Sequence, residues 1–288
     1  MKVIKGKYNL INIVVILIFS VLFINDYKNI SELFQKNGVA QILIVLATTV
    51  IVHIIKASRL YLVLYGSDIT FRSYLKVYCK VTPVSMIIPF KLGEFFRMYC
   101  YGSMLNNIIK GIVIVILDRF MDTIALVTMI LLIWIFNGGH ITSLVYVLLI
   151  FLISIVVMYC AFPGVYKFWK HYMLCAKATK RKLTILKLLG MMEHVYEEVQ
   201  GVSKGRGIIL YVMSLIAWTV EISGVVLKTG IFSNTDMSGD VADYLSAAMG
   251  GNTSVELKLF VFTSVMAMLM IYAIVKLGDW LPEKRNHK

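Results

Sequence analysis

Residues 108–136 read IIKGIVIVILDRFMDTIALVTMILLIWIF, an apolar run with Asp118, Arg119 and Asp122 in its middle. A helix needs about 17–25 mostly apolar residues to cross a bilayer, and this run is long enough. A charged side chain at the bilayer centre costs roughly 2.5–3.5 kcal/mol, so charges at that depth usually face a bundle interior or a wet cavity. The run therefore predicts a transmembrane helix with a polar site built into it.

The rest of the chain has the composition of a helical membrane protein. Its 288 residues are 59% hydrophobic, and the mean hydropathy is +0.80. Several further apolar runs reach spanning length, and the alternating pattern of a membrane β-barrel is absent from the sequence. We predict an all-α, polytopic integral membrane protein that forms a single domain over residues 1–288. The expected location is the plasma membrane of a bacterial or archaeal cell.

The distribution of basic residues predicts the topology. Six spans are expected, at about 8–25, 39–57, 109–136, 141–162, 207–231 and 257–277. Basic residues precede the first span, follow the second as Lys56 and Arg59, and number nine in the segment 163–206, whereas the loops near 137–140 and 233–256 have none. By the positive-inside rule, both termini and residues 163–206 lie in the cytoplasm. The net charge of +13 then reflects topology, and no nucleic-acid partner is expected.

Residues 60–108 do not fit a simple span, because they are semi-polar and contain Pro83, Pro89 and Gly93. Proline and glycine interrupt helices, and broken backbone at membrane depth is tolerated only inside protein or around a cavity. We interpret this segment as a re-entrant helical pair that enters the bundle from the cytoplasmic side. The alternative is an amphipathic helix on the cytoplasmic surface.

Two further segments have polar character. Residues 182–200 show apolar positions at helical spacing, which predicts an amphipathic helix on the inner leaflet or under the bundle. The lysines that precede it either attract anionic lipid or only set the topology. The segment 233–256 carries Asp236, Asp240, Asp243 and Glu256 and is predicted to be a solvated loop, with a short helix and turn on the far face or a charged lip over a cavity as the alternatives.

Around Gly93 the sequence favours a site for an anion. Gly93 permits a sharp entry into a helix, and Glu94 then falls in the first turn, near the positive end of the helix dipole. Glu94 and Arg97 are three residues apart and share a helix face, so they can pair. Arg97 could hold a phosphate by two parallel hydrogen bonds, or the pair could only orient the helix.

A second group of charges lies in the predicted third and fifth spans. Asp118 and Asp122 face the same way, and Arg119 is three residues from Asp122. This arrangement either locks two helices together or lets Arg119 exchange a carboxylate for a phosphate. Glu221 shares a face with Lys228 and follows Trp218 by one turn. The candidate site residues are therefore Glu94, Arg97, Asp118, Arg119, Asp122 and Glu221, and the residues of structural motifs are Pro89, Gly93 and Trp218.

Motifs of soluble enzymes are missing from the sequence. The five histidines form no HExxH pattern, the four cysteines lack zinc-site spacing, and neither a P-loop nor a GxSxG sequence occurs. We therefore assign no catalytic residue and expect no metal or other cofactor. The sequence contains no ATP-binding segment, so any transport that the protein performs would be passive, ion-coupled or driven by a partner.

The spacing of the charged residues resembles the membrane domain of lysylphosphatidylglycerol synthase, which also occurs as free-standing flippase-like proteins. Asp118 stands where that pattern usually has Glu. A Pro-Gly-Gly segment with a following Glu is reduced here to Gly250, Gly251 and Glu256. The residues that match the pattern are Pro89, Gly93, Glu94, Arg97, Arg119, Asp122, Trp218 and Glu221.

This resemblance implies a protein that translocates or binds an anionic phospholipid or a lipid-linked saccharide between leaflets. It does not imply synthesis of lysyl-lipid, because the soluble aminoacyl-transferase domain is expected to be absent. The alternative is a membrane subunit or scaffold of a lipid- or glycan-modifying enzyme. In that case the segment 163–206 would dock a membrane enzyme partner.

Overall fold

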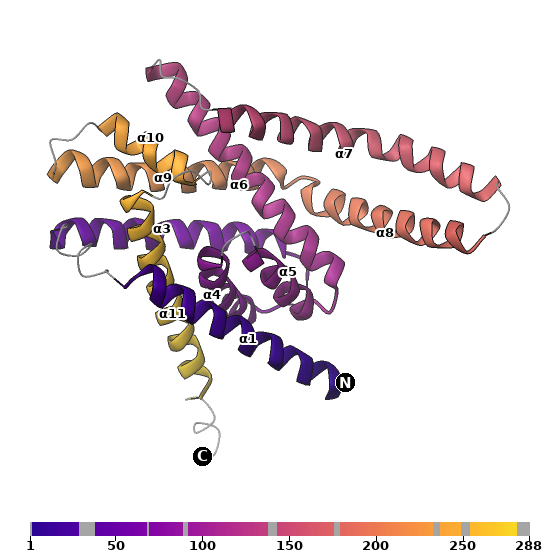
Figure 1. Cartoon of the computed structure of the whole chain (residues 1–288), viewed down its shortest axis with the longest axis horizontal. Helices are drawn as coiled ribbons and strands as arrows, with labels where there is room; N and C mark the ends of the chain where they lie inside the picture. Colours follow the sequence, from indigo (N-terminus) through magenta and orange to yellow (C-terminus); the bar gives the residue numbers. More distant parts are fainter. Residues whose placement is uncertain are drawn as a thin grey trace.

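The computed structural model describes residues 2–28, 38–67, 69–88, 92–137, 143–175, 179–232, 237–248 and 254–280. All the elements in these ranges are α-helices, arranged as a bundle from which one pair projects (Figure 1). They are α1 (Lys2–Asp26), α3 (Val39–Val63), α4 (Phe71–Ile87), α5 (Leu92–Met104), α6 (Ile108–Asn137), α7 (Ser143–Cys175), α8 (Lys180–Ser203), α9 (Gly207–Phe232), α10 (Met237–Ala248) and α11 (Val255–Trp280). The predicted all-helical class is confirmed.

Four helices of the described chain are long and apolar enough to cross a membrane: α3 and most of α7, α9 and α11. The other two predicted spans also lie on helices. In α1 the apolar stretch Asn12–Asp26 is shorter, and α6 has charged residues in its middle. Each predicted span thus coincides with a helix, whereas the number of spans and the cytoplasmic location of the termini stay predictions.

The segment 60–108 contains a pair of shorter helices, as expected. Helix α3 runs on to Val63, and the pair that follows consists of α4, with 17 residues, and α5, with 13. At about 1.5 Å per residue they measure roughly 26 and 20 Å, less than the hydrocarbon core of about 30 Å. Pro83 lies inside α4 without ending it, so the expected interruption at this residue is wrong. Pro89 lies outside the described residues.

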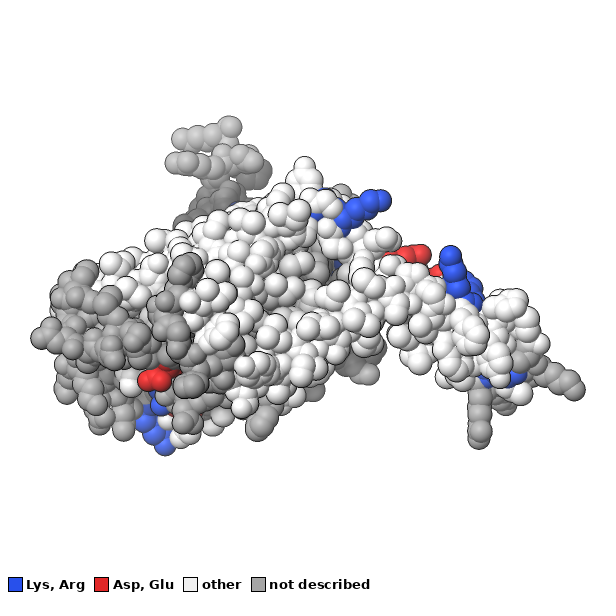
Figure 2. Space-filling model, turned by 90° about the horizontal axis from the view of Figure 1, so that it is seen from above, with Lys and Arg blue, Asp and Glu red and all other residues white. Residues whose placement is uncertain are grey.

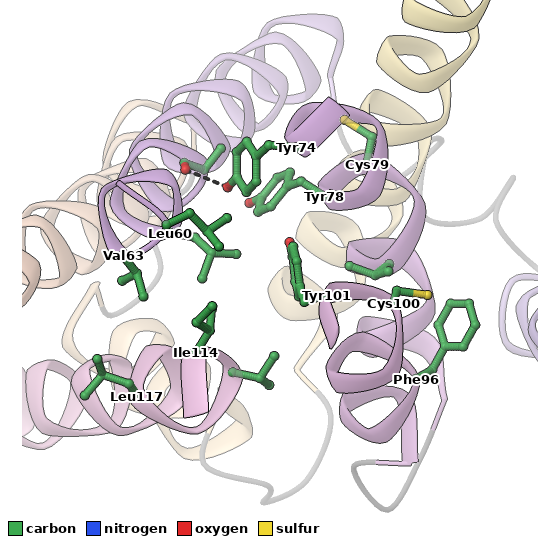
Figure 3. Packing of buried hydrophobic residues seen from close by; sticks show 14 of the residues in the cluster. Leu60, Val63, Tyr74, Tyr78, Cys79, Phe96, Cys100, Tyr101, Ile114 and Leu117 are labelled. Carbon is green, nitrogen blue, oxygen red and sulfur yellow. Dashed lines mark hydrogen bonds between the residues drawn. The ribbon is translucent and has the colours of Figure 1, made fainter. Parts of the chain in front are cut away.

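The α4–α5 pair is packed inside the bundle. Tyr74 of α4 and Tyr101 of α5 are fully buried, and their rings lie 6.5 Å apart. Figure 3 shows these tyrosines directed towards Leu60 of α3 and Ile114 of α6, and the Tyr74 hydroxyl donates to the Ala57 carbonyl oxygen over 2.7 Å. This burial favours the re-entrant interpretation over a surface helix, although the depth of the pair in a membrane stays a prediction.

Glycines let α5 approach its two neighbours closely. A Cβ atom on Gly93 would lie 2.5 Å from Cα of Ser85 in α4. A Cβ atom on Gly111 of α6 would lie 2.3 Å from the backbone nitrogen of Gly102 in α5. Gly93 is the second residue of α5 and makes this close contact with α4, and Glu94 falls in the first turn of the helix as the sequence predicted.

Helices α7 and α8 form a hairpin that projects from one end of the molecule (Figures 1 and 2). Helix α7 continues through Pro163 to Cys175, beyond the predicted end of the span at residue 162. Helix α8 includes the predicted amphipathic helix and contacts α7 through Phe162 and Tyr196, whose rings are 4.9 Å apart. The cytoplasmic location of residues 163–206 stays a prediction.

Helix α10 replaces part of the predicted solvated loop. Val241, Tyr244 and Leu245 are buried, and they pack with residues of α6 and α9 in one apolar cluster. Residues 237–248 therefore form the short helix that was one alternative, and the solvated-loop prediction is wrong for them, because Val241, Tyr244 and Leu245 form a helix face that packs on the bundle. Asp236, Gly250 and Gly251 lie outside the described residues.

Candidate functional site

Arg59 of α3 is the centre of a buried ionic network. Its Nε and Nη2 donate to Oδ1 of Asp118 over 3.1 and 2.6 Å, and its Nη1 donates to Oδ1 of Asp122 over 3.0 Å. Nη1 also donates to the Ser214 hydroxyl of α9. Since Arg59 is 3% exposed, the guanidinium group is nearly removed from solvent and joins three helices.

Arg97 of α5 binds the other oxygen of the same carboxylate. Its Nη2 donates to Oδ2 of Asp118 over 2.8 Å, and its Nη1 lies 3.6 Å from Oε2 of Glu94. The Glu94–Arg97 pair expected from the sequence is therefore present. Asp118 thus pairs with two buried arginines, Arg59 of α3 and Arg97 of α5.

Arg119 of α6 is more exposed than the other cations of the site. Its Nη2 lies 2.7 Å from Oε1 of Glu94, and 47% of its side chain is exposed. The sequence suggested that Arg119 could pair with Asp122, three residues later, but Asp122 pairs with Arg59 instead. Consecutive residues of a helix point about 100° apart, so Asp118 faces the interior while its neighbour Arg119 does not.

A second group of contacts surrounds Glu221 of α9. Lys56 of α3 donates to Oε2 of Glu221 over 3.1 Å, and the Tyr244 hydroxyl of α10 donates to Oε1. The Lys56 ammonium group also lies 5.3 Å from the centre of the Trp218 ring. The Trp218 indole donates to the Asp122 carbonyl oxygen over 3.3 Å, so it connects this group to the Arg59 network.

Lys56 and Arg59 are the charged site residues that were not predicted from the sequence. The sequence suggested basic residues that flank a cytoplasmic loop, whereas both belong to α3 and point into the bundle. The positive-inside rule cannot separate these two cases, because a basic residue near the end of an apolar run fits both. One signal was available: the candidate set contained four carboxylates and two arginines, so two cations were missing.

Lys228 belongs to a separate ion pair. It shares a helix with Glu221 as expected, but its ammonium group binds both carboxylate oxygens of Glu256 in α11, at 2.7 and 2.6 Å. This pair joins α9 to α11. It is not among the residues that line the cavity described next.

The network borders a cavity of about 260 Å³. Four cationic and three acidic side chains line it, so the lining has one positive charge in excess, and Glu94 contacts two of the cations without lining the cavity. Trp218 and apolar side chains of α10 and α11 close other parts of the wall. The charged lining residues are Lys56, Arg59, Arg97, Arg119, Asp118, Asp122 and Glu221.

Most candidate residues from the sequence meet at this cavity. Five of the six charged candidates line it, and the sixth, Glu94, supports Arg97 and Arg119. Gly93 lies at the contact of α5 with α4 instead. Within the described ranges, no group of three or more His, Cys, Asp and Glu side chains is arranged to hold a metal ion.

Ionisable side chains that face the interior or a cavity of a membrane bundle usually mark a functional site. Residues 9–251 match the family described as lysylphosphatidylglycerol synthase TM region. The chain therefore belongs to this family of membrane proteins, which are related to lipid modification or flipping, and the resemblance seen in the sequence is confirmed. No curated protein and no solved structure matches the chain.

Proposed function

We propose that this protein moves the headgroup of an anionic lipid between the leaflets of a membrane. The observation that carries the proposal is the charged cavity of about 260 Å³ inside an otherwise apolar bundle. A phosphate-bearing headgroup loses its hydration when it enters hydrocarbon, and this loss is costly unless other polar groups replace the water. Side chains of both signs around the cavity would supply those groups.

Arg119 and Lys56 are the proposed contacts for the phosphate. The side chain of Arg119 is 47% exposed and that of Lys56 is 18% exposed, and each forms an ion pair with a single carboxylate. Arg59 and Arg97 are at most 5% exposed, and each already contacts two carboxylates. A phosphate would therefore displace fewer contacts at Arg119 and Lys56 than at the two buried arginines.

The contacts of Arg97 favour a different role from the one that the sequence suggested. The sequence suggested that Arg97 contacts the phosphate while Glu94 holds it ready. The 2.8 Å contact of Arg97 with Asp118 favours a framework role instead, in which Arg97 and Arg59 together fix Asp118. Glu94 would then hold Arg119, from which it lies 2.7 Å away, until a phosphate replaces it.

The size of the cavity bears on the identity of the lipid. Pockets for typical small-molecule ligands measure about 300–1,000 Å³. The volume of about 260 Å³ suits a phosphate with a small substituent better than a lipid-linked saccharide. We therefore propose an anionic phospholipid as the first candidate substrate and a lipid-linked saccharide as the second.

The experiment is a translocation assay in proteoliposomes that contain a fluorescent anionic phospholipid. The wild-type protein is expected to bring the label in the inner leaflet within reach of an external quencher, and a zwitterionic lipid with the same label is the control. Arg119→Ala is expected to reduce the rate at least tenfold while thermal stability stays close to wild type, because the side chain is half-exposed. A normal rate per folded molecule would remove Arg119 from the site.

A second candidate function is favoured by the α7–α8 hairpin. This hairpin projects from the bundle (Figure 1). It exposes Phe168, Tyr172 and Leu174 beside Lys170. A surface of this kind could dock a lipid- or glycan-modifying enzyme, for which the protein would serve as membrane subunit. Deletion of the hairpin tip would then abolish co-purification of the enzyme, whereas lipid movement in proteoliposomes would persist.

A further inference from the structure

His53 of α3 also lines the cavity, yet it belongs to none of the ion pairs described above. It is 2% exposed, so its ring is almost entirely enclosed by protein. The ring lies nearly parallel to that of Phe260 in α11, with the centres 6.3 Å apart. These contacts fix the plane of the imidazole against the cavity wall.

The two ring nitrogens of His53 have different surroundings. Nδ1 lies 3.2 Å from the hydroxyl of Tyr78 in α4, which is itself 3% exposed. Nε2 is buried and has no hydrogen-bond partner among the described residues. An unpaired polar atom in the interior costs about 1–3 kcal/mol, so its persistence calls for a function.

The contact with Tyr78 determines whether Nε2 of His53 is a hydrogen-bond donor or an acceptor. Within the described part of the chain, Nδ1 of His53 is the acceptor available to the Tyr78 hydroxyl. A neutral imidazole has one donor and one acceptor nitrogen, so if Nδ1 accepts from Tyr78, Nε2 carries the proton. Nε2 is then a buried donor of a residue that lines a cavity already rich in cationic donors.

We propose that Nε2 of His53 donates a hydrogen bond to an oxygen atom of the bound headgroup and so makes His53 a specificity residue of the cavity. Lys56, one helical turn along α3, supplies charge on the same wall. His53 adds a directional donor that a lipid without an acceptor oxygen at that position cannot use. This inference rests on the proposed function, because it assumes that the cavity receives a phosphate-bearing headgroup.

The test is a titration of the purified full-length protein in neutral detergent with short-chain phosphatidic acid, followed by calorimetry. His53→Phe keeps an aromatic ring beside Phe260 but removes both nitrogens. We expect the affinity to fall about ten- to a hundredfold, as for the loss of a hydrogen bond to a charged acceptor. His53→Gln retains an N–H donor and should recover most of the affinity.

Thr49→Val is the matched control. Thr49 is a buried residue of the same helix, and its hydroxyl lies 3.0 Å from that of Thr263 in α11, outside the cavity lining. Its loss should lower thermal stability and leave the affinity unchanged. If His53→Phe does not fold, Tyr78→Phe carries the same test, because it frees the ring proton to move to Nδ1 and should weaken binding severalfold.

The outcomes separate this inference from the proposed function. If Arg119→Ala weakens binding and His53→Phe binds as tightly as wild type, Nε2 takes no part and only the inference is overturned. If the wild-type protein does not bind phosphatidic acid more tightly than short-chain phosphatidylcholine, the proposed function is overturned and the inference with it. Weak binding by His53→Phe together with recovery by His53→Gln supports both.

Discussion

Asp118 is the carboxylate on which the charged network depends. Each of its oxygens accepts from a different buried arginine, Arg59 on Oδ1 and Arg97 on Oδ2. A buried charge that loses its partner is strongly destabilising, whereas an intact buried pair contributes little net stability. The network therefore fixes which helices lie together more than it adds to the stability of the bundle.

Asp118→Asn tests this dependence. The substitution keeps the shape of the side chain but leaves Arg59 and Arg97 with one negative charge fewer, so we expect a loss of about 3–5 kcal/mol in the free energy of unfolding. The measurement is thermal unfolding of the purified protein, with Glu197→Gln as control. Glu197 is exposed and its ion-pair partner among the described residues is His194, which is exposed too, so its substitution should change nothing.

The residues of the site could be predicted from the sequence where the cost of a buried charge made them conspicuous. Glu94, Asp118 and Glu221 could be predicted in this way, because each interrupts or borders an apolar run. His53 and Tyr78 could not, since neither carries a formal charge and aromatic residues are common in membrane helices. Tyr244 was missed because the short helix that carries it was predicted to be a loop.

At the scale of elements, the position of α5 depends on backbone contact with α6. The Cβ atom of an alanine at position 111 would meet the nitrogen and Cα of Gly102 at 2.3 and 2.5 Å, and neither backbone atom can rotate away. The same contact holds Arg97 of α5 near Asp118 of α6. Close packing of these helices is therefore a condition for the ionic network.

Gly111→Ala should cost about 1–3 kcal/mol in stability, as overpacking usually does, and should weaken binding of anionic lipid as well. Gly190→Ala in α8 is the matched control, because nothing lies within 4 Å of the added methyl group. Alanine favours a helix over glycine by up to about 1 kcal/mol, so this control should be neutral or slightly stabilising. Equal unfolding temperatures for the two variants would contradict the close contact.

Helix positions were more predictable than helix lengths. Apolar runs located each long helix, but α7 continues through Pro163 to Cys175 and α4 continues through Pro83. Proline removes one backbone donor and disfavours a helix locally, yet packing and apolar surroundings can maintain the helix around it. Local sequence does not contain that tertiary information.

At the scale of the whole molecule, the topology can be tested directly. In a background without Cys79, Cys100, Cys160 and Cys175, single cysteines replace Asp243 of α10 or Lys187 of α8, both of which are exposed. An impermeant thiol reagent added to intact cells should label position 243 and leave position 187 unlabelled until the membrane is permeabilised. Labelling of position 187 alone would indicate the opposite orientation of the protein in the membrane.

The order of the charged residues along the chain also has a consequence for biosynthesis. In the predicted topology, α6 carries Asp118 and Asp122 into the membrane, at a cost of roughly 2.5–3.5 kcal/mol for each carboxylate in an isolated helix. Their partners Arg59 and Arg97 lie in α3 and α5, which leave the ribosome first. The counter-charges are thus already made when α6 reaches the insertion machinery.

We therefore expect α6 to insert poorly when it is synthesised alone and efficiently when α3–α5 precede it. Glycosylation mapping of truncated chains in microsomes would measure the inserted fraction of each. Arg59→Ala and Arg97→Ala in the longer chain should lower that fraction, and an unchanged fraction would mean that α6 inserts on its own hydrophobicity. On this account, α3 and α5 stay at the translocon until α6, which carries the carboxylate partners of Arg59 and Arg97, has been synthesised.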